Sequence, residues 1–311
     1  MRLSSFSRQD LADRLRGDGV FLHTGPFLSR IRTAVPAVIE GLALLYADNR
    51  VSPHEPYADF HIALRRPRNL RHWINPQVRF EFDSLVPFKP LPLAQALPML
   101  EWGLNWCIGF HAHQFLIIHA ATVEKDGMAA ILPGAPGSGK STLTAYLVHN
   151  GWRLLSDELA LISPQDGGVT PLARPISLKN RSIDVIAEAL PEAVLSARCE
   201  DTAKGTVALL KAPRQSVERI DEPARPAWVI FPRYRVDADA TLSPHPKADT
   251  LIELGQNAFN YSLHGKAGFE TLADLVEACD CYSFTYSRLP EALSVFDSLL
   301  PARHSAAGIP A

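Results

Sequence analysis

The chain has 311 residues, of which 47% are hydrophobic, enough for one large domain and a smaller one with separate cores. Its 31 lysines and arginines nearly balance 33 aspartates and glutamates, and no basic block indicates nucleic acid as a partner. The N-terminus interleaves Arg and Asp where a signal peptide needs an apolar run. The longest apolar stretch, 97–123, contains Glu101, Asn105 and three histidines, so we expect no membrane span and a soluble, cytoplasmic protein.

The four cysteines show neither CxxC spacing nor an obvious histidine partner; they are Cys107, Cys199, Cys279 and Cys281. Neither a zinc site nor a disulfide framework is therefore predicted. We expect these side chains to be small buried hydrophobes in a reducing cytoplasm.

The first ninety residues alternate short apolar runs with Pro- and Arg-rich turns, which predicts a small α/β domain over residues 1–90. Within it, Ser7 to Asp10 is typical of a capping box that starts a helix. Pro98 suits the first turn of a helix that continues to Ile108, so we place the domain boundary at about residue 91. A second domain is expected over 91–301, followed by a flexible tail at 302–311.

From residue 115 onward the sequence indicates strands and helices more clearly. Strands are predicted over 115–124 and 128–133, joined by the two-residue hairpin turn Asp126-Gly127. That turn sets the pairing, so that His119 lies opposite Gly134. A helix over 141–149 and a strand over 152–162 follow, then short strands at 207–210 and 228–231 and helices at 250–259, 269–279 and 290–300.

A glycine-rich loop stands between the predicted strand and helix. Its sequence matches G-x-x-x-x-G-K-[ST] and comprises Gly134, Ala135, Pro136, Gly137, Ser138, Gly139, Lys140, Ser141 and Thr142. Such a loop points backbone N–H groups at phosphate oxygens, with Lys140 reaching the β- and γ-phosphates and Ser141 offering its hydroxyl to Mg²⁺. The sequence therefore predicts binding of ATP or GTP with Mg²⁺.

Two acidic residues follow the next apolar run. The lengths of the intervening helix and strand bring Asp157 back level with the phosphates, where a carboxylate binds Mg²⁺ or accepts a proton. The alternative interpretation of Asp157-Glu158 is a solvated acid pair at a strand end. His119 is either part of the phosphate site or an ordinary strand histidine.

Cations on turns give further candidates for contacts to phosphate or substrate. They lie in the segment Arg174 to Asn180, in Lys204-Gly205, and at Arg233. The alternative interpretation is that all of them are surface cations.

The order of His119, the P-loop and Asp157 resembles the bacterial HPr kinase/phosphorylase family, whose fold is similar to phosphoenolpyruvate carboxykinase around the P-loop. The likeness covers about residues 115–180; the whole chain looks more like the HPr kinase-related kinase A group. It implies an α/β domain with a mixed sheet, Asp157 as acid/base for a serine hydroxyl, and Glu158 as a metal helper. Thr142 stands where the family usually has Glu, and no Glu-Ile-Arg-Gly loop is found.

Together these features predict an ATP-dependent kinase that transfers the γ-phosphate to a hydroxyl, most simply a serine of a protein or peptide. His119, Lys140 and Asp157 are its expected catalytic residues, and Ser141, Asp157 and Glu158 its metal-binding residues. A kinase for a small-molecule hydroxyl and a nucleotide-gated binding module are the alternatives. A homo-oligomer is left open.

Overall fold

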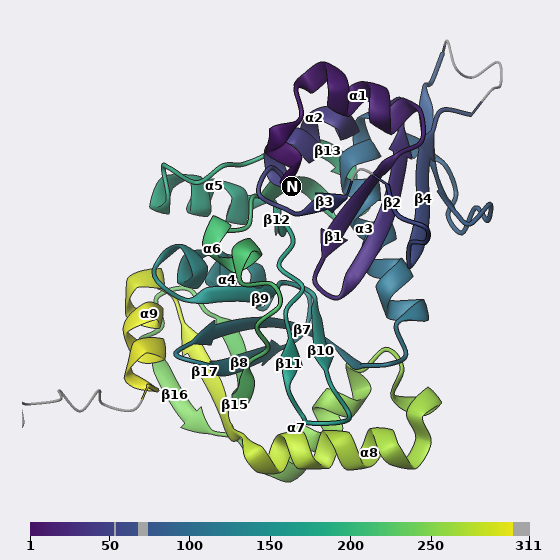
Figure 1. The fold of residues 1–311 in the computed structure, drawn as a ribbon. Coiled ribbons are helices and arrows are strands. Elements are labelled where there is room, and N and C mark those ends of the chain that lie inside the picture. The colour runs from purple at the N-terminus through teal and green to yellow at the C-terminus, as the bar shows by residue number, and fades with distance from the viewer. Residues whose placement is uncertain (53, 68–73, 301–311) are drawn as a thin grey trace, which may run out of the picture.

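The computed structural model describes residues 1–52, 54–67 and 74–300 (Figure 1). Its helices are α1 Arg8–Arg16, α2 Pro36–Leu45, α3 Ala96–His111, α4 Lys140–His149, α5 Arg181–Ala189, α6 Arg214–Glu218, α7 Lys247–Gln256, α8 Tyr261–Ala278 and α9 Leu289–Ser298. Its strands are β1 Val20–Thr24, β2 Phe27–Thr33, β3 Val51–Ser52, β4 Phe60–Arg65, β5 Gln77–Phe82, β6 Leu91–Pro92, β7 Leu116–Lys125, β8 Met128–Pro133, β9 Arg153–Ser156, β10 Leu159–Ile162, β11 Val169–Thr170, β12 Ile176–Lys179, β13 Cys199–Thr202, β14 Gly205–Leu210, β15 Arg225–Tyr234, β16 Thr241–Pro244 and β17 Asp280–Tyr286. The expected tail at 302–311 lies outside the described residues.

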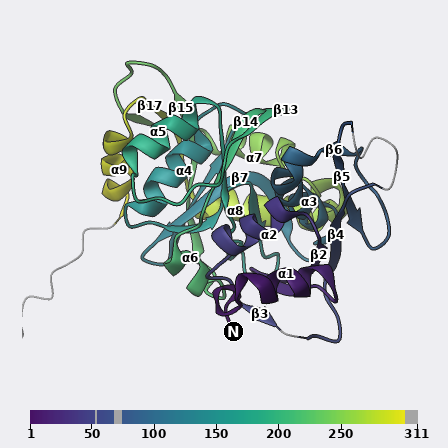
Figure 2. The same cartoon turned by 90° about the horizontal axis from the view of Figure 1, so that it is seen from above.

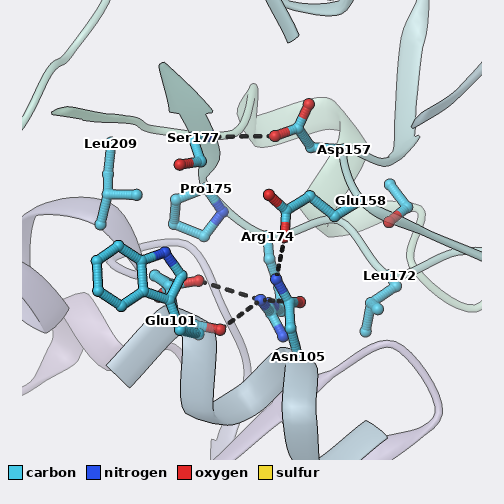
Figure 3. Close-up of a pocket in the computed structure, with 11 residues that line it drawn as sticks. Glu101, Asn105, Asp157, Glu158, Leu172, Arg174, Pro175, Ser177 and Leu209 are labelled. Carbon is cyan, nitrogen blue, oxygen red and sulfur yellow. Dashed lines mark hydrogen bonds and ion pairs between the residues drawn. The ribbon is translucent and has the colours of Figure 1, made fainter. Parts of the chain in front are cut away.

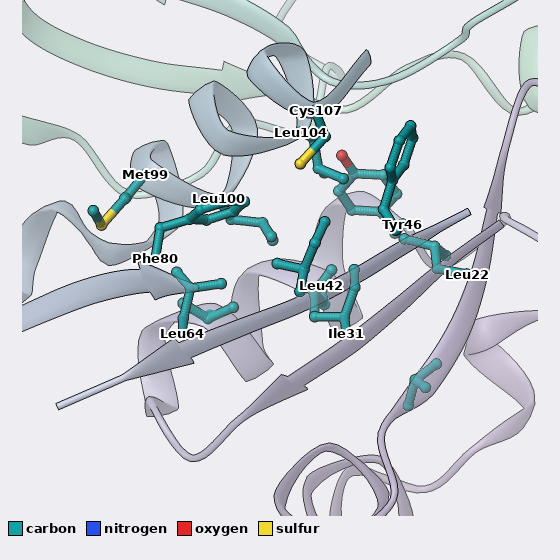
Figure 4. Packing of buried hydrophobic residues seen from close by; sticks show 14 of the residues in the cluster. Leu22, Ile31, Leu42, Tyr46, Leu64, Phe80, Met99, Leu100, Leu104 and Cys107 are labelled. Atoms are coloured by element: carbon teal, nitrogen blue, oxygen red, sulfur yellow. The ribbon is translucent and has the colours of Figure 1, made fainter. Parts of the chain in front are cut away.

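The N-terminal part is a six-stranded sheet in the order β3-β1-β2-β4-β5-β6, with α1, α2 and α3 packed into its core. We call this unit the N-terminal layer. Leu22, Ile31 and Leu64 on the strands meet Leu42 on α2 and Leu104 on α3 in an apolar interior (Figure 4). Alternate strand residues face this interior, which is the period-2 pattern of a sheet with one covered face.

Two elements that we expected to open the second domain belong to the N-terminal layer. β6 pairs with β5, and α3 packs on β5 and α2. Gly103 explains the close fit of α3, because a Cβ at this position would overlap the ring of Phe80. The core of the layer also takes in Ile117 and Leu172, so it is continuous with the interior that follows.

The central sheet has eight strands of mixed direction, in the order β11-β10-β7-β8-β15-β17-β16 with β9 beside β7. β15 runs parallel to both β8 and β17, whereas the neighbours of β7 are antiparallel to it. Leu143 of α4 and Phe296 of α9 enter the core on one face, and Leu254 of α7 and Leu272 of α8 enter the core on the other. This arrangement confirms the expectation of a mixed α/β fold (Figure 2).

Several local predictions are confirmed. Ser7 caps α1 by accepting a hydrogen bond from the Asp10 N–H, and β7 pairs with β8 from Lys125 opposite Met128 to Ala120 opposite Pro133. The predicted strand over 152–162 is divided into β9 and β10, and β17 was not predicted. A short sheet in the order β12-β14-β13 lies beside α4 and α5.

All four cysteines are free and buried, as expected from their spacing. Within the described ranges, no helix combines the length and apolarity that a membrane crossing requires.

Candidate functional site

The glycine-rich loop joins β8 to α4, at the edge of the central sheet where the parallel strand β15 also ends. Gly134, Gly137 and Gly139 have φ values of 149°, 85° and 96°, conformations that side chains with a Cβ rarely adopt. At Gly139 a Cβ would also lie closer than 3.0 Å to the hydroxyl oxygen of Tyr286. Local geometry and packing therefore both require glycine at the N-terminus of α4.

Two tyrosines hold the loop in place. The Tyr234 N–H donates to the Ser138 carbonyl (3.0 Å), and the Tyr286 hydroxyl donates to the Gly139 carbonyl (3.1 Å). Tyr286 is buried on β17, whereas Tyr234 at the end of β15 is 44% exposed beside the loop. Sequence reasoning missed both residues, because β15 and β17 lie about a hundred residues or more beyond the loop and only the sheet order unites them.

Lys140 begins α4 and points back over the loop. Its Nζ donates to the carbonyls of Gly134 and Ala135, the latter at 3.2 Å. Burial lowers the pKa of Lys140, and the nearby charge of Asp157 opposes that shift. Ser138 Oγ is buried with no hydrogen-bond partner among the described residues. The loop thus presents a cation and a spare hydroxyl at a glycine-lined helix N-terminus, which is the chemistry that a phosphate chain needs.

Asp157 reaches the loop because of a β-bulge. The register of β9 against β7 shifts by one residue between Leu154 opposite Val123 and Ser156 opposite Thr122, and the new register continues to Leu159 opposite His119. Asp157 consequently lies across from Ala121, whose face of β7 packs against α4. A one-residue slip reverses the face of every later side chain, so without the bulge Asp157 would face the core of α7 and α8.

Asp157 is 7% exposed, and the hydrogen-bonding capacity of its carboxyl group is only partly satisfied. Oδ2 accepts a hydrogen bond from the Ser177 N–H (3.0 Å), whereas Oδ1 has no partner within hydrogen-bond distance among the described residues. Burial, followed by the charge of Glu158, raises the pKa of Asp157 to about 6, while the Ser177 N–H and the nearby Ser141 hydroxyl act to lower it. A carboxylate with a pKa close to neutrality is suited to accepting and returning a proton.

Glu158 points away from Asp157, toward α3. Its Oε2 accepts a hydrogen bond from Asn105 Nδ2 (2.5 Å), and Lys179 Nζ lies 3.9 Å from its Oε1. Glu158 is therefore an anchored acid beside Asp157 and not a freely solvated strand end.

A buried polar network continues from Asn105 into the N-terminal layer (Figure 3). Arg174 Nη2 donates to Asn105 Oδ1 (2.7 Å) and to Glu101 Oε2 (3.2 Å), and the Tyr46 hydroxyl donates to Glu101 Oε1 (2.6 Å). Burial raises the pKa of Glu101, and the charge of Arg174 opposes this. Arg174 is thus a structural cation and not a surface one. Glu101 and Asn105 were noted in the sequence only as polar interruptions of an apolar stretch.

The cavity around this network has a volume of about 20 Å³ and is lined by Asp157, Arg174 and Ser177 among others. Ser177 Oγ and the Nε and Nη1 groups of Arg174 are buried there without hydrogen-bond partners among the described residues. This space and these groups suit one ordered water molecule between Arg174 and Asp157.

His119 lies at the end of the β7–β8 pairing, one residue beyond Ala120 opposite Pro133, as the hairpin register predicted. Its ring packs on Phe259 with centroids 5.8 Å apart. Burial, and then the charge of Lys140, lowers the pKa of His119, which favours the neutral imidazole. The charges of Lys140 and Glu158 both affect the pKa of His119, so His119 lies near the P-loop and the acid pair.

The remaining candidates differ in position. Lys204 lies in the turn between β13 and β14, with its Nζ 5.4 Å from the centroid of the Trp102 ring of α3. Its positive charge also contributes to lowering the pKa of His119. Arg233 is exposed on β15 beside Tyr234. Thr142 lies in the first turn of α4 and is partly exposed. Lys179 and Lys204 therefore belong to the surroundings of the acid pair, whereas no contact of Arg233 with that pair is found among the described residues.

The donor set fits a nucleotide and Mg²⁺. A serine hydroxyl and an aspartate oxygen are hard oxygen ligands, the type that Mg²⁺ prefers when substrate phosphates and water complete its shell. No cluster of three or more His, Cys, Asp or Glu side chains able to hold a metal occurs in the described part of the chain. Ser141 and Asp157 would hold Mg²⁺ together with the phosphates.

No family model matches the sequence, and the search of curated proteins found no match. Among solved structures, the chain is similar to the HPr(Ser) kinase/phosphatase from Coxiella burnetii, with 12% sequence identity and a TM-score of 0.27. The match covers 59% of this chain and 96% of that one.

Proposed function

We propose that the chain is an ATP-dependent kinase that transfers the γ-phosphate to a hydroxyl group, that of a serine in a protein or peptide. One observation carries the proposal: the buried carboxyl group of Asp157, with its raised pKa, lies beside both Lys140 and Ser141 of a P-loop. A P-loop alone supports nucleotide binding. The adjacent acid supplies what transfer to a hydroxyl additionally needs.

In this proposal the acceptor hydroxyl gives its proton to Asp157 as its oxygen forms a bond to the γ-phosphorus. The bond from the γ-phosphorus to the β–γ bridging oxygen breaks, and ADP leaves with the electron pair. Lys140 would neutralise charge on the transferring group, and Mg²⁺ held by Ser141 and Asp157 would supply further charge neutralisation. ATP and GTP are both compatible with a loop that binds phosphates through backbone N–H groups.

His119 and Glu158 have supporting roles in the proposal. A neutral imidazole near Lys140 orients groups at the site without adding a second positive charge. Glu158 is held by Asn105 beside Asp157, and its charge helps to raise the pKa of the Asp157 carboxyl group. We therefore assign proton transfer to Asp157 alone.

The test is incubation of the protein with γ-labelled ATP, Mg²⁺ and extract of its own cells, in parallel with the Asp157→Asn and Lys140→Ala variants. Label appearing on a protein with the parent chain, and not with either variant, supports the proposal. Label on a small metabolite would instead identify a small-molecule kinase. Tight ATP binding with no transfer to any acceptor would indicate a nucleotide-gated binding module and overturn the proposal.

A further inference from the structure

The outer face of the N-terminal sheet is basic and open. Along β2, β4 and β5 the side chains that alternate with the core residues are Arg32, His61, Ala63, Arg65, Arg79 and Glu81. We call these six residues the outer face. The buried residues of α1, α2 and α3 all join the core on the opposite side of the sheet, so none of these helices covers the outer face.

The arginines of the outer face are placed at an energetic cost. Arg65 lies directly across from Arg79 in the β4–β5 pairing, and like charges at opposed positions destabilise a sheet. Glu81 forms ion pairs with both arginines, at 3.2 Å from Arg65 Nε and 2.6 Å from Arg79 Nη2. Arg32 forms no ion pair within the described part of the chain. Asp83 lines the same hollow, so three arginines stand against two acidic residues, and the surface keeps a positive balance although the whole chain has a formal charge of −2.

The outer face is also hollow. Two adjoining hollows of about 540 and 580 Å³ share Arg65 and Arg79, and Ala63 forms part of the floor because its side chain is small. Arg66, which is exposed, lines the second hollow. Val86, 47% exposed, adds an apolar patch to the rim of the first. An extended chain laid across the strands would meet several guanidinium groups and one apolar contact.

We propose that the outer face is a docking site for an acidic segment of a partner polypeptide. Guanidinium groups bind carboxylates in a planar, two-point geometry, and the deficit of negative charge on the face matches such a segment. Single-stranded nucleic acid fits less well, since it needs exposed aromatic rings on which bases stack, and the aromatic side chain found among the described residues that line the two hollows is the half-buried imidazole of His61. The outer face does not include any P-loop residue, and docking there does not depend on the kinase activity.

The test measures binding of a fluorescein-labelled decaglutamate peptide to the full chain by fluorescence anisotropy at low ionic strength. We compare the parent with the double variant Arg32→Gln/Arg65→Gln. The control is Arg8→Gln/Arg181→Gln, which removes the same charge from exposed arginines that have no ion pair with other described residues. Unfolding midpoints of both variants establish that they are folded.

We expect the outer-face variant to bind the peptide at least about tenfold more weakly than the parent, and the control to stay within about twofold. Added salt should weaken parent binding, because the contacts are between exposed charges. Equal binding by parent and outer-face variant would overturn the proposal, as would absence of binding by the parent. Tighter parent binding to a single-stranded decanucleotide than to the peptide would assign the face to nucleic acid instead.

Discussion

Replacing Asp157 by Asn separates the chemistry of this carboxyl group from its shape. The amide oxygen of Asn can still accept the hydrogen bond from the Ser177 N–H, whereas the negative charge and the basicity are lost. If Asp157 accepts the proton of the acceptor hydroxyl, the transfer rate should fall by roughly two to four orders of magnitude with little change in Mg-ATP affinity. If it mainly holds Mg²⁺, affinity itself should weaken and added Mg²⁺ should partly restore transfer.

The same variant should be more stable than the parent at neutral pH. Burial raises the pKa of Asp157 from 3.8 to about 6, so ionising it in the folded chain costs roughly 3 kcal/mol. Between these two pKa values the folded state binds more protons than the unfolded state, and the free energy of unfolding therefore falls as pH rises through this window. The substitution by Asn removes this cost of ionising a buried carboxyl group, which is fully present above about pH 6 and absent below about pH 4.

The measurement is chemical unfolding of parent and variant without nucleotide at pH 8 and at pH 4, together with ATP binding and transfer rates. We expect a gain of up to about 3 kcal/mol at pH 8 and nearly none at pH 4. Asp166→Asn, in an exposed turn, is the matched control and should change neither activity nor the pH dependence in this way. Unchanged binding and transfer in Asp157→Asn would remove both proposed roles. Lost activity with no stabilisation at pH 8 would show that the carboxyl group is not desolvated.

Three further substitutions test the P-loop and its neighbours. Lys140→Ala should abolish transfer and weaken ATP binding by a few kcal/mol, because it removes charge-assisted contacts to phosphate, and calorimetric ATP titration checks this. His119→Ala should lower transfer less than Asp157→Asn does, and an equal or greater loss of rate would contradict a merely orienting role. Gly139→Ala should destabilise the chain by about 1–3 kcal/mol and impair ATP binding, since the new Cβ meets Tyr286 at a left-handed φ; a parental unfolding midpoint would refute the reported packing.

Local sequence determined the loop and the hairpin in front of it. The P-loop is recognisable because its glycines are needed at defined spacings by the backbone alone, and φ is positive at Gly134, Gly137 and Gly139. The Asp126-Gly127 turn likewise set the β7–β8 pairing, since a two-residue loop leaves one register. Interactions this short in range depend little on the rest of the chain.

Tertiary structure decided how the other site residues converge. The bulge between β7 and β9 turns Asp157 toward α4, and no residue type in the strand predicts this bulge. Tyr286 meets the P-loop because β17 lies beside β15, a pairing between segments about fifty residues apart. Arg174 is buried against Glu101 because α3 packs between the N-terminal sheet and the loop before β12. Each of these contacts depends on how the sheets and helices pack their apolar faces against one another. The residue spacing within a single motif does not determine that packing.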